Sequence, residues 1–458
     1  MSRPSHTLPA PLDAAPLPEV INHTPWPSQY FQHIDPQGEV FHVMVTRTSY
    51  SLRHFEQGED GLLVPQLLNP AEQLPLCQAD QFAGQPNASS LLQESDFAPY
   101  KPKCDVLVVN ATAYAPGGKP MKRWPVGFRF GDAIHKTFEV TGPRRFGLLG
   151  LGEPEGASHV PLCYERAFGG PNLVTQGQAL SAYAEQPAGS KSDNSSNSTE
   201  HARLQSQVAR NLQAALPGLY APNPIGCGRL PKELAATNLN LARLDASNLP
   251  QPQAREYEQA ARQAPRPAPQ IEAFGHPCTG QDDYPVVGIG PVGRWWAPRI
   301  QLAGTHDERW KQTQWPKSPL DHDYRYWNCA PEDQQIDYPA GGEDFALAGF
   351  TPQPAKDGGP VRFALPKQDL QLLVRLQVGA MVFAPMHIDT VVLDLKEGTL
   401  SIVRRATISA KALVRQLELG AWPAGTGMAP DEEMKELAKA KLQNNANTAP
   451  SAKGVPRG

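Results

Sequence analysis

The stretch Val40–Tyr50, VFHVMVTRTSY, carries the pattern from which the fold class follows. From Phe41 to Val45 every second residue is apolar, while the residues between them are mixed. A period of two is typical of a β-strand that turns one face towards a core and the other towards solvent. We therefore expect a half-buried strand over these residues.

The neighbouring segments also favour strands. Cys104–Asn110 (CDVLVVN) is a continuous apolar run, which predicts a buried strand. Trp124–Phe130 and Ile134–Val140 flank Gly131-Asp132, a typical hairpin turn, and the Pro/Gly-rich Tyr114–Pro120 predicts another turn. Residues 20–150 are therefore expected to be all β, although 61–100 show no clear period.

The C-terminal part of the chain shows the same period. Asp369–Val378 and Thr390–Leu395 predict strands, and the second is expected to pair with Thr399–Thr407 across a short turn. Helices are expected over Ser409–Leu419 and Asp431–Gln443; the second begins with acidic residues and carries lysines later, which suits the helix dipole. Residues 280–346 hold five of the eight tryptophans and fit neither period, so loops packed on a β framework are expected.

Residues 171–270 differ in character from both flanks. Gln186–Glu200 (QPAGSKSDNSSNSTE) is polar and of low complexity, which indicates a flexible link. Arg203–Leu216 places an apolar residue at every fourth position and predicts an amphipathic helix. Gln253–Ala264 predicts a weaker one. The region is therefore interpreted as an insertion that carries local helices.

Together these patterns predict an α+β, β-rich fold with mainly antiparallel, sandwich-like sheets, long Pro/Gly-rich loops and a helical insertion. Five regions are expected: a disordered arm with five prolines (1–20), an N-terminal β-rich region (21–170), the linker and helical insertion (171–270), aromatic-rich loops with C-terminal strands of the same core (271–425), and a C-terminal helix and tail (426–458).

The composition argues against several classes of protein. A chain of 458 residues can bury a sizeable core without metal or disulfides. Its 48 prolines, roughly double the usual share, argue against long helices, because each removes a backbone donor. The formal net charge of -4 offers no positive field for nucleic acid or acidic membranes. No signal-peptide core or membrane-length apolar run is present, so a cytoplasmic location is expected.

The cysteines and histidines do not form a recognisable metal site. The six cysteines lack a C-x-x-C pair, which argues against zinc-ribbon and thioredoxin-like folds. Their even number permits disulfides, but we expect reduced structural thiols. His306 beside Asp307, and His322 between Asp321 and Asp323, are the polar clusters. Alternate side chains of an extended segment point to opposite faces, so hydrogen-bonded loop residues are expected and no metal.

No catalytic motif stands out either. Gly288–Gly293 has the letters G-x-G-x-x-G, but no regular strand leads into it, and we expect Arg294–Pro298 not to open a helix. A structural loop is therefore expected. Glu165 beside Arg166 could act as a general acid or base, although an ion pair or bonds from backbone amides would be more usual. We expect no catalytic residue and no cofactor.

The aromatic residues between Trp295 and Trp327 alternate with four arginines: Arg294, Arg299, Arg309 and Arg325. Such a cluster could stack nucleic-acid bases or form a protein-binding surface, because Trp, Tyr and Arg dominate binding hot spots. Burial of most of these rings in the β core is expected, and the negative net charge argues against nucleic acid.

Several short motifs follow one another in a specific order over residues 20–425. They are KPKCDVLV (Lys101–Val108), APGGKP (Ala115–Pro120), VTGPR (Val140–Arg144), YERAFGG (Tyr164–Gly170), NPIGCG (Asn223–Gly228), WAPR (Trp296–Arg299), GTHDERW (Gly304–Trp310) and NCAPEDQQ (Asn328–Gln335). In these motifs the chain resembles the bacterial domain-of-unknown-function family 2169, whose members are encoded beside type VI secretion spike proteins. The polar stretch between Gly170 and Asn223 looks longer than is usual for the family.

The resemblance implies a non-catalytic adaptor or chaperone that binds a secreted effector, in some cases through its PAAR-like region, and helps to load it onto the VgrG spike. The implied partners are that effector and the VgrG and PAAR spike proteins. No catalytic residue carries over. The motif residues expected to shape the fold or contact the partner are Tyr164, Glu165, Arg166, Phe168, Gly169, Gly170, Asn223, Pro224, Trp296, Pro298, Arg299, Gly304, Asp307, Trp310, Asn328 and Pro331.

Two points stay open at the level of sequence. The partner surface could lie on the variable insertion or on exposed aromatic residues. The alternatives to an adaptor are a hydrolase-like enzyme with a cleft near Glu165 and His306, and a structural spike-associated protein, although no β-helical repeat is visible.

Overall fold

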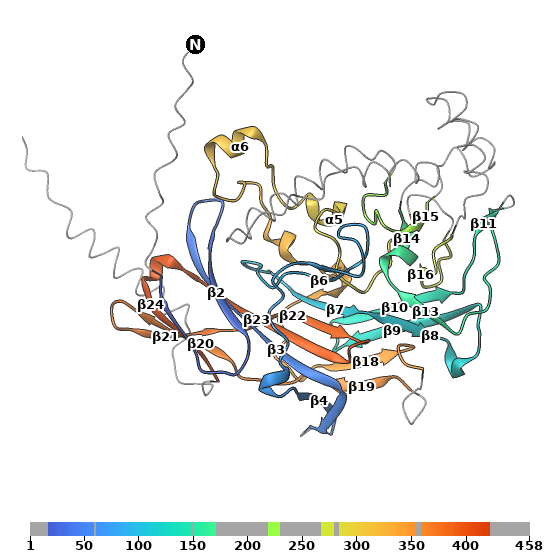
Figure 1. Ribbon diagram of the computed structural model, residues 1–458, viewed down its shortest axis with the longest axis horizontal. Helices are drawn as coiled ribbons and strands as arrows, with labels where there is room; N and C mark the ends of the chain where they lie inside the picture. Colours follow the sequence, from blue (N-terminus) through green and yellow to red (C-terminus); the bar gives the residue numbers. More distant parts are fainter. Residues whose placement is uncertain are drawn as a thin grey trace, which may run out of the picture.

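The computed structural model describes residues 17–58, 61–147, 150–170, 219–229, 267–278, 284–352 and 359–421 (Figure 1). The segments expected at Gln186–Glu200, Arg203–Leu216, Gln253–Ala264 and Asp431–Gln443, and most of the expected N-terminal arm, lie outside these residues. The described chain is rich in strands, which pair mainly antiparallel, and its helices are short.

The largest sheet has seven strands and contains residues from both ends of the described chain. Its order is β17-β7-β22-β23-β3-β2, with β4 added on β3. Only the pair β22 and β7 is parallel in this sheet. The strands are β2 (Ser28–Ile34), β3 (Val40–Gln57), β4 (Leu63–Leu67), β7 (Cys104–Val109), β17 (Gln335–Ile336), β22 (His387–Asp394) and β23 (Thr399–Ser409).

Two smaller sheets pack against this one. A five-stranded antiparallel sheet has the order β16-β10-β9-β18-β19, and a four-stranded sheet has the order β1-β24-β20-β21. Their strands are β16 (Ile271–Ala273), β10 (Ile134–Thr141), β9 (Arg123–Phe130), β18 (Asp344–Ala348), β19 (Val361–Ala364), β1 (Glu19–Asn22), β24 (Val414–Gly420), β20 (Gln371–Leu376) and β21 (Met381–Pro385).

The remaining elements are short. Four two-stranded sheets join β5 (Gln81–Phe82) to β6 (Leu91–Gln93), β8 (Ala111–Tyr114) to β13 (His159–Leu162), β11 (Phe146–Gly147) to β12 (Gly150–Leu151), and β14 (Phe168–Gly169) to β15 (Cys227–Gly228). Among the residues that the structure describes, the α-helices are α5 (Ala297–Ile300) and α6 (Glu308–Thr313). In the same described ranges, 3-10 turns lie at Pro70–Glu72, Pro116–Gly118, Tyr164–Arg166, Tyr324–Trp327, Glu332–Gln334 and Ala410–Ala412.

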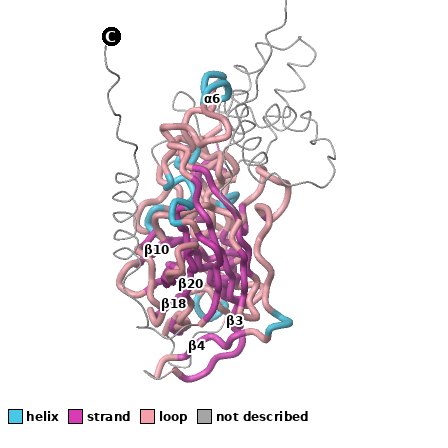
Figure 2. Tube along the Cα trace, turned by 90° about the vertical axis from the view of Figure 1, so that its left-hand side faces the viewer, coloured by secondary structure: helices cyan, strands magenta, loops and turns pink. Residues whose placement is uncertain are grey.

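The two smaller sheets share one face of the seven-stranded sheet. Tyr50 and Ile402 of that face pack into the core made with the five-stranded sheet, while Met44 and Ala406 pack into the core made with the four-stranded sheet. In Figure 1 the four-stranded sheet lies at the left and the five-stranded sheet at the right, with β3 and β23 between them. Figure 2 shows the strands gathered together, with loops and α6 above them.

Several expected strands are confirmed. β7 is buried at every position, as the apolar run predicts. β9 and β10 form the expected hairpin, in which Phe130 pairs with Ile134. β22 and β23 pair antiparallel from Asp394 and Thr399 onward. Long apolar runs and short glycine-containing turns were therefore sufficient to locate these elements.

The expectation of a half-buried strand at Val40–Tyr50 is only partly correct. The strand exists and runs on to Gln57, but residues 42–51 are buried on both faces. Val45, on the face away from the smaller sheets, packs with Leu76, Phe97 and Val403. A layer of loops covers that second face, which the alternation of side chains alone does not indicate.

Three expectations about local structure are wrong. Ser409–Leu419 is not a helix, because a 3-10 turn over Ala410–Ala412 leads into β24. In that strand Leu417 and Leu419, both fully buried, lie two residues apart and therefore share one face. The end of the expected disordered arm belongs to β1, which pairs with β24. Arg294–Pro298 does open a helix, the single turn α5, whose first turn accommodates Pro298 because its amide needs no partner there.

A buried arginine marks the seam between the two cores. Arg404 of β23 is 2% exposed, and it pairs across the sheet with Thr46. Gln368, in the connection from β19 to β20, accepts bonds from Arg404 Nη1 at 3.1 Å and from Thr48 Oγ1 at 3.2 Å. No carboxylate oxygen lies within 4.0 Å of this guanidinium in the described part of the chain, and burial lowers the pKa of Arg404. The Gln368 amide is therefore a main source of compensation for this charge.

We expect Gln368→Leu to lower the free energy of unfolding by about 2 kcal/mol, because it leaves a buried charged donor without its acceptor. Arg404→Met removes the charge and fills similar space, so its effect should stay within about 1 kcal/mol. Urea unfolding of both variants, followed by tryptophan fluorescence, checks this. Equal losses for the two variants would contradict the assigned role of Gln368.

Candidate functional site

The loop-covered face of the seven-stranded sheet carries charged residues where a core would normally be apolar. Arg47 of β3, Asp105 of β7, Asp389 of β22 and Arg405 of β23 are each at most 5% exposed. Residues 68–103 and 284–334 supply the groups that compensate these charges. Three of the motifs, Lys101–Val108, Trp296–Arg299 and Asn328–Gln335, meet in this layer, which makes it the candidate functional site.

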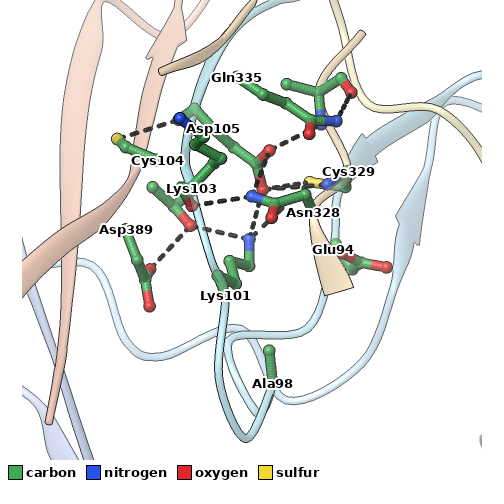
Figure 3. A network of polar contacts seen from close by, with 12 residues as sticks. Glu94, Ala98, Lys101, Lys103, Cys104, Asp105, Asn328, Cys329, Gln335 and Asp389 are labelled. Carbon is green, nitrogen blue, oxygen red and sulfur yellow. Dashed lines mark hydrogen bonds and ion pairs between the residues drawn. The ribbon is translucent and has the colours of Figure 1, made fainter. Parts of the chain in front are cut away.

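The centre of this layer is the carboxylate of Asp105, which has no solvent exposure (Figure 3). It accepts bonds from Lys101 Nζ at 2.8 Å, from the Cys329 amide at 3.0 Å and from the Ala330 amide at 3.1 Å. Asn328 Nδ2 donates to it at 3.1 Å and also to the Lys103 carbonyl at 2.8 Å. One side chain of β7 therefore holds two separate loops against the sheet.

Lys101 is the cation of this centre and is 4% exposed. Its ammonium also donates to Thr390 Oγ1 of β22 at 2.9 Å. Burial is the largest single effect and would lower the pKa of Lys101, but the Asp105 carboxylate and smaller effects of nearby groups, Asp389 and Glu94 among them, together outweigh it and raise that pKa, so the lysine stays charged. Burial also raises the pKa of the neighbouring Cys329 thiol, which keeps it protonated.

A β-bulge brings a second carboxylate to the same face. The register of β22 against β23 shifts between Ile388 and Thr390, which leaves Asp389 as the extra residue. Asp389 accepts bonds from Arg405 Nε at 2.6 Å and from Thr390 Oγ1 at 2.9 Å. Arg405 Nη1 in turn donates to the Asp96 carbonyl at 2.9 Å. The bulge thus links the sheet to the loop around residue 96.

A third group of charges lies among the loops. Glu94 lies 2.6 Å from Arg294 Nε and 2.8 Å from Arg299 Nη2. Burial would raise the pKa of Glu94, but the two guanidinium groups outweigh it and hold that pKa below its ordinary value. Arg299 also donates to the carbonyls of Val292 and Tyr326, and Arg294 lies 3.1 Å from Asp80.

These ion pairs are balanced in sign. The five cations of the layer are Arg47, Lys101, Arg294, Arg299 and Arg405, and the five anions are Asp80, Glu94, Asp96, Asp105 and Asp389. Each carboxylate has a cation within 4.0 Å. Such a network fixes the geometry of the loops and leaves no unpaired carboxylate among these five for proton transfer.

The YERAFGG and NPIGCG motifs meet at Tyr164, which is 4% exposed. Asn223 Nδ2 donates to the carbonyls of Tyr164 and Phe168, each at 3.0 Å. Gly170, at φ 82°, donates its amide to Asn223 O at 2.7 Å, and a Cβ there would lie 2.0 Å from Gly226 O. Only glycine fits this close approach of two backbones. Pro224 is buried beside Asn223.

The G-x-G-x-x-G letters belong to this packing. The hydroxyl of Tyr164 donates to Gly290 O at 2.9 Å, and its ring packs edge-on against Trp296 at 4.8 Å. A Cβ at Gly288 would lie 2.3 Å from the Tyr164 ring, and one at Gly293 would lie 2.6 Å from Trp296 Nε1. The loop over Gly288–Gly293 is therefore structural, as expected.

Glu165, the suggested general acid or base, serves as an acceptor. Its two oxygens accept bonds from the Ser90 amide at 2.7 Å and from Ser90 Oγ at 2.5 Å. Burial would raise the pKa of Glu165, but the bonds from Ser90 outweigh it and lower that pKa. Arg166 donates to Gln270. Glu165 and Arg166 therefore each hold a neighbouring segment in place by hydrogen bonds, to Ser90 and to Gln270 respectively.

The GTHDERW motif forms a separate lobe, residues 301–323, which includes α6. Asp307 caps α6 by accepting the Trp310 amide at 2.7 Å. The Trp310 indole donates to Lys317 O at 3.1 Å and packs 4.7 Å from His306. Gly304, at φ 81°, sits where a Cβ would meet Pro319 at 2.8 Å. His306 and Asp307 therefore stabilise the lobe. Glu165, which the sequence placed with His306 in a possible cleft, instead bonds to Ser90 outside the lobe.

The aromatic residues between Trp295 and Trp327 lie in the loop layer and not in the β core, and only some of them are fully buried. Tyr326 packs with Ile300 and Ala303, and Trp295 and Trp327 lie against them. Trp310 and Trp296 are also buried, while Trp315 is 45% exposed. Pro298 is exposed on α5, and Pro331 precedes the 3-10 turn at Glu332–Gln334. The expectation that most of these rings are buried in the β core is therefore wrong: Trp296, Trp310 and Tyr326 are buried, and they pack in the loop layer.

The cysteines are free, and no disulfide joins the six. Burial raises the pKa of Cys77, Cys163 and Cys227 to about 12, so these thiols are protonated at neutral pH. Within the described ranges, no group of three or more His, Cys, Asp and Glu side chains could hold a metal ion. No helix in the same ranges is long and apolar enough to cross a membrane.

Sequence reasoning missed most of the buried charges. Glu94, Asp389 and Arg405 were not singled out, and Lys101 and Asp105 were noted only as part of the motif Lys101–Val108. A usable signal was present, because Asp105 interrupts an apolar run and Arg404-Arg405 lies inside a strand pattern. A charge within an otherwise apolar strand requires a partner, since burying it alone is very costly.

We expect Asp105→Asn to lower the free energy of unfolding by about 3–5 kcal/mol, because Lys101 would remain buried without its anion. Asp337→Asn is the matched control: its ion pair with Lys103 is solvent-exposed, so its loss should cost about 0–1 kcal/mol. Denaturant unfolding of both variants measures the difference. Similar losses would show that the Asp105 centre does not hold the loop layer.

The 3-10 turn Tyr324–Trp327, which follows the lobe, is joined to β2 by an imidazole that we expect to make stability depend on pH. His33 Nε2 lies 3.1 Å from the Tyr324 hydroxyl, and burial, with a smaller effect of His322, lowers the pKa of His33 to about 4. The folded state therefore binds this proton less readily than the unfolded state. Its stabilising contribution is complete above pH 6.5 and is lost as the pH falls towards 4.

The loss should reach roughly 3 kcal/mol at most, because each pKa unit is worth about 1.4 kcal/mol. His33→Gln should remove this part of the dependence, whereas His54→Gln, at an exposed position of β3, should not. Urea unfolding at several values between pH 7 and pH 4 compares the three proteins. An unchanged slope in His33→Gln would contradict the prediction.

The comparisons with known proteins agree with the motif resemblance. A family described as an uncharacterised protein conserved in bacteria, DUF2169, matches residues 41–405. Searches of curated proteins and of solved structures gave no match. The matched range includes the seven-stranded sheet from β3 to most of β23 and all of the charged loop layer. The chain therefore belongs to the DUF2169 family of bacterial proteins.

Proposed function

We propose that the protein is a non-catalytic adaptor that binds a type VI secretion effector in the cytoplasm, keeps it folded and helps to load it onto the VgrG spike. The proposal rests first on the ordered motifs and on membership of the family that they indicate. Effectors with a PAAR-like region are the expected cargo. Binding to the folded effector stabilises it by mass action.

The observation that carries the proposal furthest is the surface of the α6 lobe. Trp315 is 45% exposed and Leu320 is 66% exposed, five residues apart in one short segment. Tryptophan is enriched at binding hot spots, and each of these side chains offers a large apolar surface to a partner. We assign these two side chains as anchors for the effector.

The lobe is also well ordered by its own contacts. The Trp310 indole bond to Lys317 O, the cap by Asp307 and the bonds from Thr305 to Asp321 close it internally. Holding a binding segment in its bound form reduces the entropy lost on association. In this proposal the inward-facing motif residues shape the loop layer, and the lobe supplies the contact.

The first test is co-expression of the chain with the effector encoded beside it, followed by pull-down on the tagged chain. The adaptor function predicts stable co-purification, and loss of soluble effector when the chain is left out. No complex and an unchanged effector level would contradict the proposal for this pair. Screening Glu165→Gln against the unmodified chain for hydrolysis would then be the next step.

A second experiment tests the lobe itself. Trp315→Ala combined with Leu320→Ser should weaken effector binding at least about tenfold, because hot-spot residues contribute about 2 kcal/mol or more each. Val378→Ser combined with Met381→Ser is the matched control: these residues are 65% and 54% exposed at the β20–β21 turn. The control variant should bind the effector normally, and both double variants should keep the melting temperature of the unmodified chain. Equal weakening in the two doubles would exclude the lobe as the contact.

A further inference from the structure

A cavity of about 340 Å³ lies at the end of the core between the seven-stranded and five-stranded sheets. The end of β7, β8 and β13, and the loop over residues 287–290 surround it, and Phe138 of β10 and Ile271 of β16 complete the wall. Protein interiors are usually packed so closely that voids larger than a water molecule are rare. A hollow of this size lies within the range of small-molecule sites.

The wall of the cavity is largely apolar and satisfied in its hydrogen bonds. The Tyr164 hydroxyl donates to Gly290 O, Ser90 Oγ donates to Glu165, and Asn110 Nδ2 donates to Asp394. None of the buried polar side-chain atoms without a partner in the described chain belongs to a lining residue. Burial also raises the pKa of Cys163 to about 12, which keeps its thiol neutral. Water therefore gains few partners inside.

The opening can be located from the exposure of the lining residues. Ala83, Pro161 and Lys396 line the cavity and are exposed, whereas Phe138, Leu162 and Ile289 are buried. The mouth therefore lies between the loop at Ala83, β13 and the β22–β23 turn. Lys396 is the only formally charged residue among those that line the cavity in the described chain. The site thus combines an apolar interior with one positive charge at its rim.

We propose that this cavity binds a small amphipathic carboxylate, with its apolar chain in the core and its carboxylate near Lys396. The burial of apolar surface supplies most of the affinity, and the charge at the rim selects an anionic head group over a cationic one. The site lies apart from the α6 lobe in sequence and in lining residues, so it is independent of effector binding.

Two glycines of the wall offer a contrast for testing. A Cβ at Gly290 would sit 3.7 Å from Val108 O and 3.8 Å from Val109 Cγ1, which is ordinary contact with lining residues. A Cβ at Gly288 would lie 2.3 Å from the Tyr164 ring. A larger side chain at position 290 can therefore occupy the cavity, whereas one at position 288 would disrupt the packing of Tyr164.

The experiment is a calorimetric titration of the full chain with decanoate below its micelle concentration, with decyltrimethylammonium as the cationic comparison. Decanoate should bind and raise the melting temperature, and the cationic compound should bind more weakly. Gly290→Leu should weaken decanoate binding at least about tenfold. Lys396→Ala should weaken it about threefold, and Lys311→Ala on α6 should leave it unchanged.

A readout on the unmodified chain keeps the test independent of whether Gly290→Leu folds. A diazirine-bearing decanoate analogue, cross-linked by light and located by mass spectrometry, should label residues of the segments 108–114, 161–164 or 287–290. Labelling confined to other segments would overturn the site, as would absence of decanoate binding or an equal affinity in a folded Gly290→Leu. Failure here leaves effector co-purification unaffected, because that experiment uses no lipid.

Discussion

The Asp105 carboxylate is the contact on which the loop layer depends. It sits on a central strand, has no access to water, and is neutralised by one lysine and three N–H donors from a loop more than 200 residues away in sequence. A buried ion pair adds little to stability compared with apolar packing, but removing one partner is costly. The consequence is specificity: the loop around Asn328–Ala330 has one position on the sheet that satisfies this charge.

The same logic extends across the sheet. Asp389, placed by a bulge, and the Glu94 cluster repeat the arrangement of a fixed charge that selects one loop position. On the opposite face, Arg404 and Gln368 do so at the seam between two apolar cores. Long proline-rich loops are thereby held in a single arrangement without disulfides. The same loops carry the α6 lobe and contribute residues 287–290 to the wall of the apolar cavity.

Sequence reasoning located the elements whose signal is local. Cys104–Val109, the hairpin at Phe130 and Ile134 and the hairpin after Asp394 follow from apolar runs and short turns. The segment Val414–Gly420 was assigned wrongly because Leu413 and Leu417 fit a helical spacing while Leu417 and Leu419 fit a strand. Its backbone pairs with β20, and this pairing across the sheet makes the segment a strand. Of the candidate site, the sequence identified the motif residues but not their partners, because contacts such as Lys101 with Thr390 join distant parts of the chain.

The pairing of β3 with β23 has a consequence for how the chain is made. Arg47 and Ser401, which bond across these strands, lie 354 residues apart. At translation rates of about 5–20 residues per second, the first of these strands waits on the order of half a minute for its neighbour to leave the ribosome. During that time Val43 and Val45 have no β23 to cover them, and high contact order slows folding further. Nascent chains of this protein should therefore depend on general ribosome-associated chaperones until the C-terminal strands emerge.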